Sequence, residues 1–228
     1  MNLLLAAVLL LQDKTAEETF KKIEETVSAT KTLTFKFDVK LVKAIGGEES
    51  VLRGTILLKK GNRMWCDSAV LKGSSQKKML FVSDGSKVAA VADGRTFEAK
   101  ETSRDFNASL TALITRAGAV NVIAGITSLL FGEGLNVEKP PSVTEIKSGE
   151  DDGTMKTLRY TTVMTPLAGR PATLDVRLWY EPKSLSLVKR TMRYRSETDA
   201  LIYSETYEEF TLTADIPDEK FKLPVEKK

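Results

Sequence analysis

The alternation of apolar and polar residues from position 33 to position 41 constrains the fold more than any other feature of this sequence. Apolar side chains stand at Leu33, Phe35, Phe37, Val39 and Leu41, with polar residues between them. A period of two is typical of a strand that buries one face and exposes the other. The segment therefore predicts a half-buried strand.

Further strand patterns follow along the chain, separated by turn signals such as Ser83-Asp84-Gly85-Ser86 and Asp93-Gly94. The turns recur at roughly eight- to twelve-residue intervals, and strands and helices do not alternate as in a parallel βαβ fold. The sequence predicts a mainly β (α+β) fold, a strongly curved antiparallel sheet or incomplete β-barrel. We expect its later strands at 51–60, 63–67, 77–83, 87–92, 96–100, 142–148, 154–165, 173–180, 186–196 and 201–213.

Two segments have a helical pattern. The first begins at Thr15, a candidate N-cap with Glu18 completing a capping box. Apolar residues recur in this segment at helical spacing, which predicts an amphipathic helix that packs on a flat surface. They are Ala16, Phe20, Ile23 and Val27. The second is a helical insertion at about 103–135, whose residues 109–131 are apolar nearly all round.

Two helices packed across a curved sheet could leave its interior either partly hollow or completely filled. They could cover the concave face and leave an apolar, partly hollow space, with the insertion acting as a lid. They could equally fill the concavity as a solid core. Both alternatives remain open at the level of sequence.

The N-terminus carries an apolar run from Leu3 to Leu11. The run is too short to span a bilayer and suits the apolar core of a signal peptide, which we place at 1–12. The alternative is a buried N-terminal strand or helical turn. On the first interpretation, residues 13–228 form a single domain that is exported as a soluble protein.

Composition excludes several classes of function. The 34 basic and 31 acidic residues give a net charge of +3, which does not favour nucleic acid. Histidine is absent, which excludes Ser-His-Asp and Cys-His catalysis and argues against zinc. The lone Cys66 is expected to be a small buried residue. Of the acidic pairs, Glu208-Glu209 is expected to point to opposite faces of a strand, and Asp151-Asp152 lies in a turn. We therefore expect no enzyme activity, cofactor or metal.

Three ordered motifs resemble those of the LolA-like periplasmic lipoprotein carriers. They are the segment from Gly54 to Trp65, the segment Leu80-Phe81-Val82-Ser83-Asp84-Gly85-Ser86-Lys87, and the closing Phe221-Lys222-Leu223-Pro224. Lys60 stands where the family has a functionally important arginine, and Gly61 stands where it has a proline. The resemblance marks Lys60 as a partner-contact residue.

The resemblance implies an incomplete barrel whose helical lid encloses an apolar cavity for lipoprotein acyl chains or other lipid. It also implies a periplasmic setting with membrane-bound donor and acceptor proteins, and we expect a monomer. The alternative is an envelope sensor or protein-interaction module of the same fold. The expected ligand-binding residues are Phe35, Phe37, Val39, Ile56, Leu58, Trp65, Leu80, Leu113, Ile114, Ile126 and Leu130.

Overall fold

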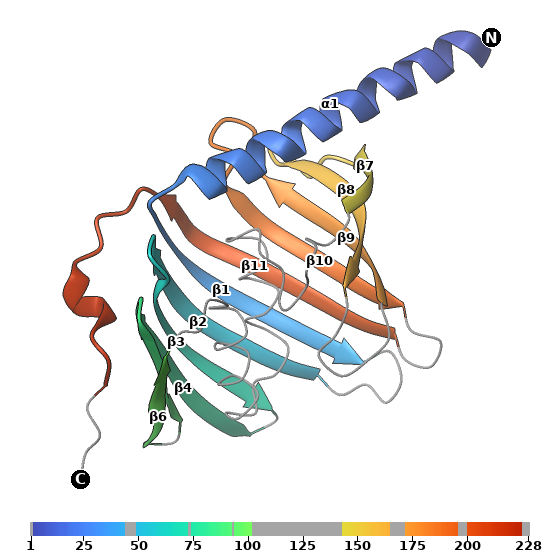
Figure 1. Cartoon of the computed structure of the whole chain (residues 1–228). Helices are drawn as coiled ribbons and strands as arrows, with labels where there is room; N and C mark the ends of the chain where they lie inside the picture. The colour runs from blue at the N-terminus through green and yellow to red at the C-terminus, as the bar shows by residue number, and fades with distance from the viewer. Residues whose placement is uncertain are drawn as a thin grey trace.

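The computed structural model describes residues 2–43, 49–72, 74–92, 94–101, 143–164, 172–195 and 200–224. One long α-helix, α1 (Asn2–Ala29), precedes the strands, and a short 3-10 helix, η1 (Asp218–Phe221), follows them (Figure 1). The strands are β1 (Thr32–Lys43), β2 (Glu49–Lys59), β3 (Arg63–Lys72), β4 (Ser75–Asp84), β5 (Lys87–Ala92), β6 (Arg95–Glu101), β7 (Val143–Ser148), β8 (Lys156–Met164), β9 (Ala172–Tyr180), β10 (Leu187–Arg195) and β11 (Ala200–Leu212).

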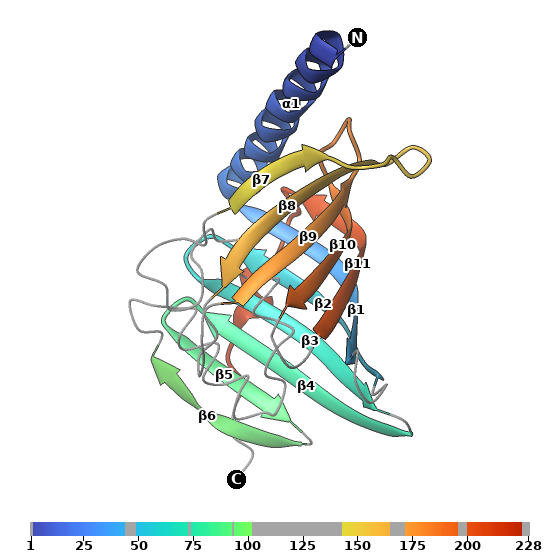
Figure 2. The ribbon, with the colours of Figure 1, turned by 90° about the vertical axis from the view of Figure 1, so that its right-hand side faces the viewer.

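The strands of the described residues all belong to one 11-stranded sheet in the order β6-β5-β4-β3-β2-β1-β11-β10-β9-β8-β7. Each neighbouring pair is antiparallel, and the first strand pairs with the last in the middle of the sheet. The sheet bends strongly without closing, because β6 and β7 stand at opposite ends of the strand order (Figure 2). The predicted mainly β, incomplete-barrel fold is confirmed.

Helix α1 differs from the prediction in where it begins. It starts at Asn2, so Thr15 lies inside the helix and is not its N-cap. There, the Thr19 hydroxyl donates a 2.8 Å hydrogen bond to the Thr15 carbonyl oxygen. The leucines and alanines of the apolar run are strong helix formers, which explains why the helix continues through them. No helix in the described part of the chain has the length and apolarity needed to cross a membrane.

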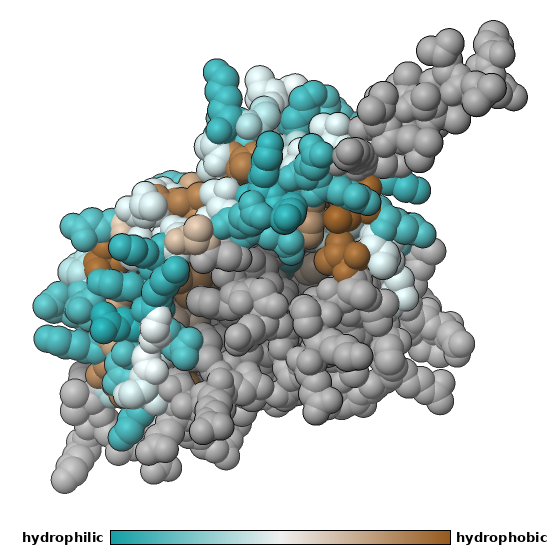
Figure 3. Space-filling model, turned by 45° about the horizontal axis from the view of Figure 1, so that its top comes forward, coloured by the Kyte–Doolittle hydropathy of each residue, from teal (hydrophilic) through white to brown (hydrophobic). Residues whose placement is uncertain are grey.

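The face of the sheet that packs against α1 is called the inner face here. Every second residue of the central strands points to it, and these side chains form one hydrophobic core with α1. The four apolar residues predicted for the amphipathic helix are all buried in this core, which confirms that part of the prediction: Ala16, Phe20, Ile23 and Val27. Exposed side chains in the view of Figure 3 are mainly hydrophilic, with hydrophobic ones in separate small groups.

The opposite, outer face carries a second buried group formed by the C-terminal segment. Helix η1 lies against β3 and β4, and the ring of Phe221 is buried there. Asp218 holds this segment to the sheet, accepting hydrogen bonds from Lys59 Nζ at 2.5 Å and from Arg63 Nη1 at 2.8 Å. The closing Phe221 motif of the sequence thus serves to attach the C-terminal segment to the outer face.

One glycine and one bulge shape the inner face. A Cβ on Gly54 would lie 2.8 Å from the tip of the Phe37 ring, so only glycine leaves room for that ring. On β11, the register shifts opposite β1, and Glu209 adopts a φ of 54°. As a result Glu208 and Glu209 are both exposed. The expectation that this pair points to opposite faces is wrong, because the bulge interrupts the alternation.

Candidate apolar binding surface

The inner face carries an apolar strip that crosses five strands without interruption. Register pairs align Phe35 of β1, Ile56 of β2, Cys66 of β3, Phe81 of β4 and Ala90 of β5 in one row. All five side chains are at most 2% exposed. Within this chain the row is therefore a continuous, buried apolar surface.

A cluster of aromatic rings extends this strip from β1 onto β11. The ring of Phe35 stacks on Phe210 at a centroid distance of 5.5 Å and meets Tyr207 edge-on at the same distance. Phe37 lies 6.2 Å from Phe35, again edge-on. The β11 bulge makes this cluster possible, because it brings Phe210 to the same face as Tyr207 despite the three-residue spacing.

Five of the expected ligand-binding residues come together on the inner face. Phe35, Phe37 and Val39 are buried on β1, and Ile56 and Leu58 are buried beside them on β2. The remaining expected residues of the helical insertion, Leu113, Ile114, Ile126 and Leu130, lie outside the described residues.

Trp65 and Leu80 lie on the outer face, apart from the other five. Trp65 stands between the inner-face residues Met64 and Cys66, and its ring lies 5.6 Å from the ammonium of Lys220. Leu80 is likewise flanked by the buried Met79 and Phe81. Because side chains alternate along a strand, neither residue can share the inner surface. Their apolar character alone did not reveal which face they occupy.

Lys60 occupies the turn between β2 and β3, where it is exposed. Its backbone N–H donates a 2.9 Å hydrogen bond to the Lys31 carbonyl oxygen. The next residue, Gly61, has a φ of 83°. Proline, with φ fixed near about −65°, could not adopt this conformation, so the turn has a different shape from one built on a proline.

A buried polar cluster interrupts the apolar inner face. Arg190 of β10 and Glu205 of β11 are 3% and 1% exposed, and Arg190 Nε donates a 2.8 Å hydrogen bond to Glu205 Oε2. Arg190 Nη2 lies 2.7 Å from the same oxygen, and the Tyr207 hydroxyl also donates to it. This cluster was not predictable from the sequence, because Arg190 and Glu205 come together only through the pairing of β10 with β11.

The electrostatics of the cluster keep the arginine charged and the tyrosines neutral. Burial acts to lower the pKa of Arg190, but the Glu205 carboxylate, together with Tyr207 and Tyr160, outweighs it, and the net result is a raised pKa. Burial raises the pKa of Tyr207 well above its ordinary value and also raises the pKa of the neighbouring Tyr160. The cluster is therefore a salt bridge whose carboxylate accepts from the Tyr207 hydroxyl, with the Tyr160 hydroxyl beside the guanidinium.

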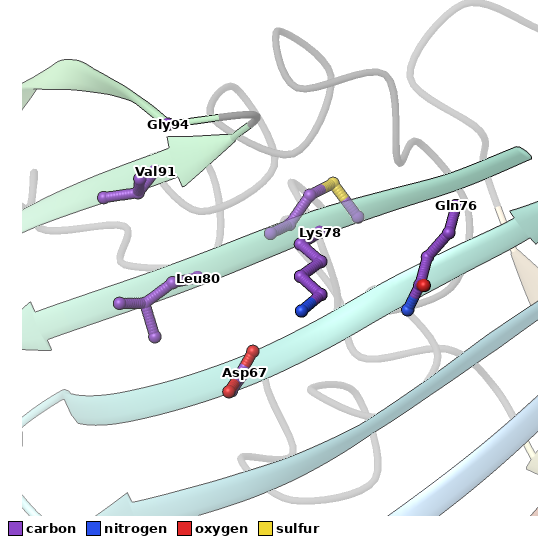
Figure 4. A pocket seen from close by; sticks show the side chains of 7 residues that line it. Asp67, Gln76, Lys78, Leu80, Val91 and Gly94 are labelled. Carbon is purple, nitrogen blue, oxygen red and sulfur yellow. The ribbon is translucent and has the colours of Figure 1, made fainter.

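A pocket of about 340 Å³ opens on the outer face, over β3, β4 and β5. Figure 4 shows its mixed lining, with apolar side chains beside a carboxylate, an amide and an ammonium group. It is lined by Asp67, Gln76, Lys78, Met79, Leu80, Val91 and Gly94. Among the described residues, no group of three or more cysteine, aspartate or glutamate side chains could hold a metal ion.

Together these features define an open antiparallel half-barrel with an apolar inner face and a helix packed at one end of it. No family model matches the sequence, and no curated protein matches it. Among solved structures, three matches each cover at least 90% of this chain.

The crystal structure of LprF from Mycobacterium bovis is 10% identical, with a TM-score of 0.47 over 90% of this chain and 96% of LprF. A LolA superfamily protein from Nitrosomonas europaea is 12% identical, with a TM-score of 0.41 over 91% of this chain and 97% of that one. A putative outer membrane lipoprotein-sorting protein domain from Vibrio parahaemolyticus is 9% identical, with a TM-score of 0.37 over 90% and 97%.

Proposed function

We propose that this protein binds the acyl chains of a lipid or lipoprotein on the inner face of its sheet and carries them without changing any bond. The observation that supports this most is the apolar strip from Phe35 to Ala90, which faces the concave side of an open sheet. Helix α1 packs at the other end of the sheet, where Phe20 meets Tyr160 of β8.

The physical driving force for such binding is burial of hydrocarbon. Each methylene removed from water contributes about 0.8 kcal/mol, so a chain of about twelve supplies ample gross free energy even after the cost of association. The surface needs no specific polar contact to hold such a chain. This suits the inner strands, where Ile56, Cys66 and Phe81 present only apolar groups and a thiol.

The setting that fits this function is the periplasm, with residues 1–12 as a signal peptide and 13–228 as the carrier domain. The carrier would work as a monomer and exchange its ligand with membrane-bound donor and acceptor proteins. Lys60 is suitably placed for contact with such a partner, because it is exposed at the turn between β2 and β3.

Lipid extraction tests the proposal. Protein purified from its natural host is extracted with solvent and analysed by mass spectrometry, and we expect bound acyl lipid. Leu58→Ala removes an inner-face side chain and should reduce the lipid recovered per mole of folded protein. Leu57→Ala, one residue away on the outer face, is the matched control. The proposal would be disproved if the purified protein contained no lipid and also failed to bind fatty-acid probes.

A second function, an envelope sensor or interaction module, is favoured by the open sheet. In the described part of the sheet, β6 and β7 each pair with one strand only. An unpaired edge can accept a strand from a partner protein. Loss of envelope signalling with intact lipid transport in a deletion strain would favour this function over the carrier.

A further inference from the structure

We propose that Arg190 binds the carbonyl oxygen of an acyl ester or amide, and so fixes where the polar end of the bound chain lies. This inference rests on the proposed carrier function and names the part of the ligand that the inner face recognises. It starts from the fact that Arg190, only 3% exposed, stands beside Glu205 on a mainly apolar face.

The cluster stands in the middle of a straight row across the sheet. Val39 lies opposite Glu205, Glu205 lies opposite Arg190, and Arg190 lies opposite Leu178. The row continues with apolar side chains on both sides, to Leu52 of β2 and Leu158 of β8. A salt bridge in such a row is costly to desolvate, and apolar residues of similar volume would stabilise the fold at least as well. A role in recognition explains its presence.

The hydrogen bonds of the cluster leave one donor group available. Nε of Arg190 and the Tyr207 hydroxyl both donate to Glu205 Oε2. Nη2 of Arg190 lies 2.7 Å from that same oxygen but lacks the alignment of a hydrogen bond, and it has no hydrogen-bond partner although it is buried. Buried donors without an acceptor are rare in folded proteins, so this group is suited to an acceptor brought by a ligand.

The net charge of the cluster determines whether a charged or a neutral acceptor can bind to Arg190. Arg190 and Glu205 form a neutral pair, so an added carboxylate or phosphate would bring an uncompensated negative charge into an apolar interior. The carbonyl oxygen of an ester or amide accepts a hydrogen bond without adding charge. The site therefore favours acylated compounds over free fatty acids.

The position also fits the rest of the proposed surface. Tyr207 of the cluster lies opposite Phe37 and edge-on to Phe35. A carbonyl held at Arg190 would direct its acyl chain over Val39 and these rings toward β2 and β3. Because the guanidinium is buried, a ligand reaches it only when the packing over it opens.

Two probes that differ in one oxygen test the inference. 1-Monopalmitoylglycerol carries an ester carbonyl, and 1-O-hexadecylglycerol has the same chain length and head group with an ether in its place. Their affinities are measured by displacement of a fluorescent fatty-acid analogue from the full chain. We expect the ester to bind about tenfold more tightly, the effect of one hydrogen bond to a charged donor.

The variant Arg190→Met/Glu205→Gln removes the guanidinium without leaving a buried charge unpaired, and it should bring the ester-to-ether ratio to about one while retaining ether binding. Arg193→Met, on the exposed face of the same strand, should leave the ratio unchanged. Equal affinities of the wild-type protein for both probes would overturn the inference and leave the carrier proposal intact, whether or not the double variant folds. Failure to bind either probe would overturn both.

Discussion

The ring of Phe20 in α1 meets the ring of Tyr160 in β8 edge-on, with centroids 4.9 Å apart and planes at 63°. Both side chains are buried, at 7% and 8% exposure. This contact joins the helix to the sheet at the end away from the apolar strip. It therefore anchors the helix to the core at the β8 side of the sheet, and the same core continues to the strip of β1–β5.

Replacing Phe20 by alanine should loosen the helix from the sheet. Truncating a buried phenylalanine leaves a cavity and costs about 3–5 kcal/mol of unfolding free energy. Urea denaturation followed by circular dichroism measures the loss. Lys21→Ala, on the exposed side of the same turn, should change the unfolding free energy by less than about 0.5 kcal/mol. Equal effects of the two substitutions would contradict the packing described.

The salt bridge between Arg190 and Glu205 should show strong coupling. Arg190→Met alone leaves the Glu205 carboxylate buried without its partner, and we expect a loss of about 3–5 kcal/mol. Adding Glu205→Leu should restore most of that stability, because both charges are then absent. The double-mutant cycle in chemical denaturation measures the coupling. Additive losses would show that the two groups do not interact in the folded protein.

The thiol of Cys66 should be unreactive in the folded protein. Burial raises the pKa of this thiol to about 12, so almost no thiolate exists at neutral pH. A chromogenic disulfide reagent at pH 8 should label Cys66 only after addition of denaturant. A Cys66→Ala/Thr154→Cys variant, with its thiol in an exposed turn, should react at once. Rapid labelling of the native wild-type protein would contradict the burial of Cys66.

The C-terminal segment should detach in acid. The hydrogen bond from Lys59 lowers the pKa of the Asp218 carboxyl below its ordinary value of 3.8, with Arg63 acting in the same direction. A lowered pKa means that the stabilisation is fully present above pH 3.8 and is lost as the pH falls through the lower, folded-state value.

The emission of Trp65, which lies beside Lys220, reports this detachment when measured in a Trp179→Phe background. We expect an emission change below pH 3.8 in the parent and an already shifted emission at neutral pH in Asp218→Asn. Asp215→Asn, in an exposed position nearby, is the control. If the Trp65 emission changed neither with pH nor on substitution of Asp218, the role of this side chain would be refuted.

The strands and turns were predictable because their signals are local. From Phe35 to Val39 the alternation is in the sequence itself, and the residues found buried are those that the period predicts. The predicted strand bounds agree with the structure to within a few residues in most cases. The start of α1 was wrong, because a capping box at Thr15 is a weaker signal than the helix propensity of the leucines before it.

The composition of the site depended on information that is not local. Trp65 and Leu80 are apolar and stand on the expected strands, but they occupy the alternate positions, whose side chains point to the outer face. The bulge at Glu209 and the register shift between Leu187 and Lys189 change which side chains face inward, and neither follows from residue types. The pairing of Arg190 with Glu205 depends on that register and so could not be predicted.

Photolabelling with a fatty-acyl monoglyceride that carries a diazirine in its chain tests the central claim most directly. Irradiation of the complex and peptide mapping by mass spectrometry locate the chain on the protein. We predict labels on inner-face residues of β1–β4 such as Val39, Ile56 and Met64. Labels confined to the outer pocket around Leu80 and Val91, or no labels at all, would contradict the assignment of the inner face as an acyl-binding surface.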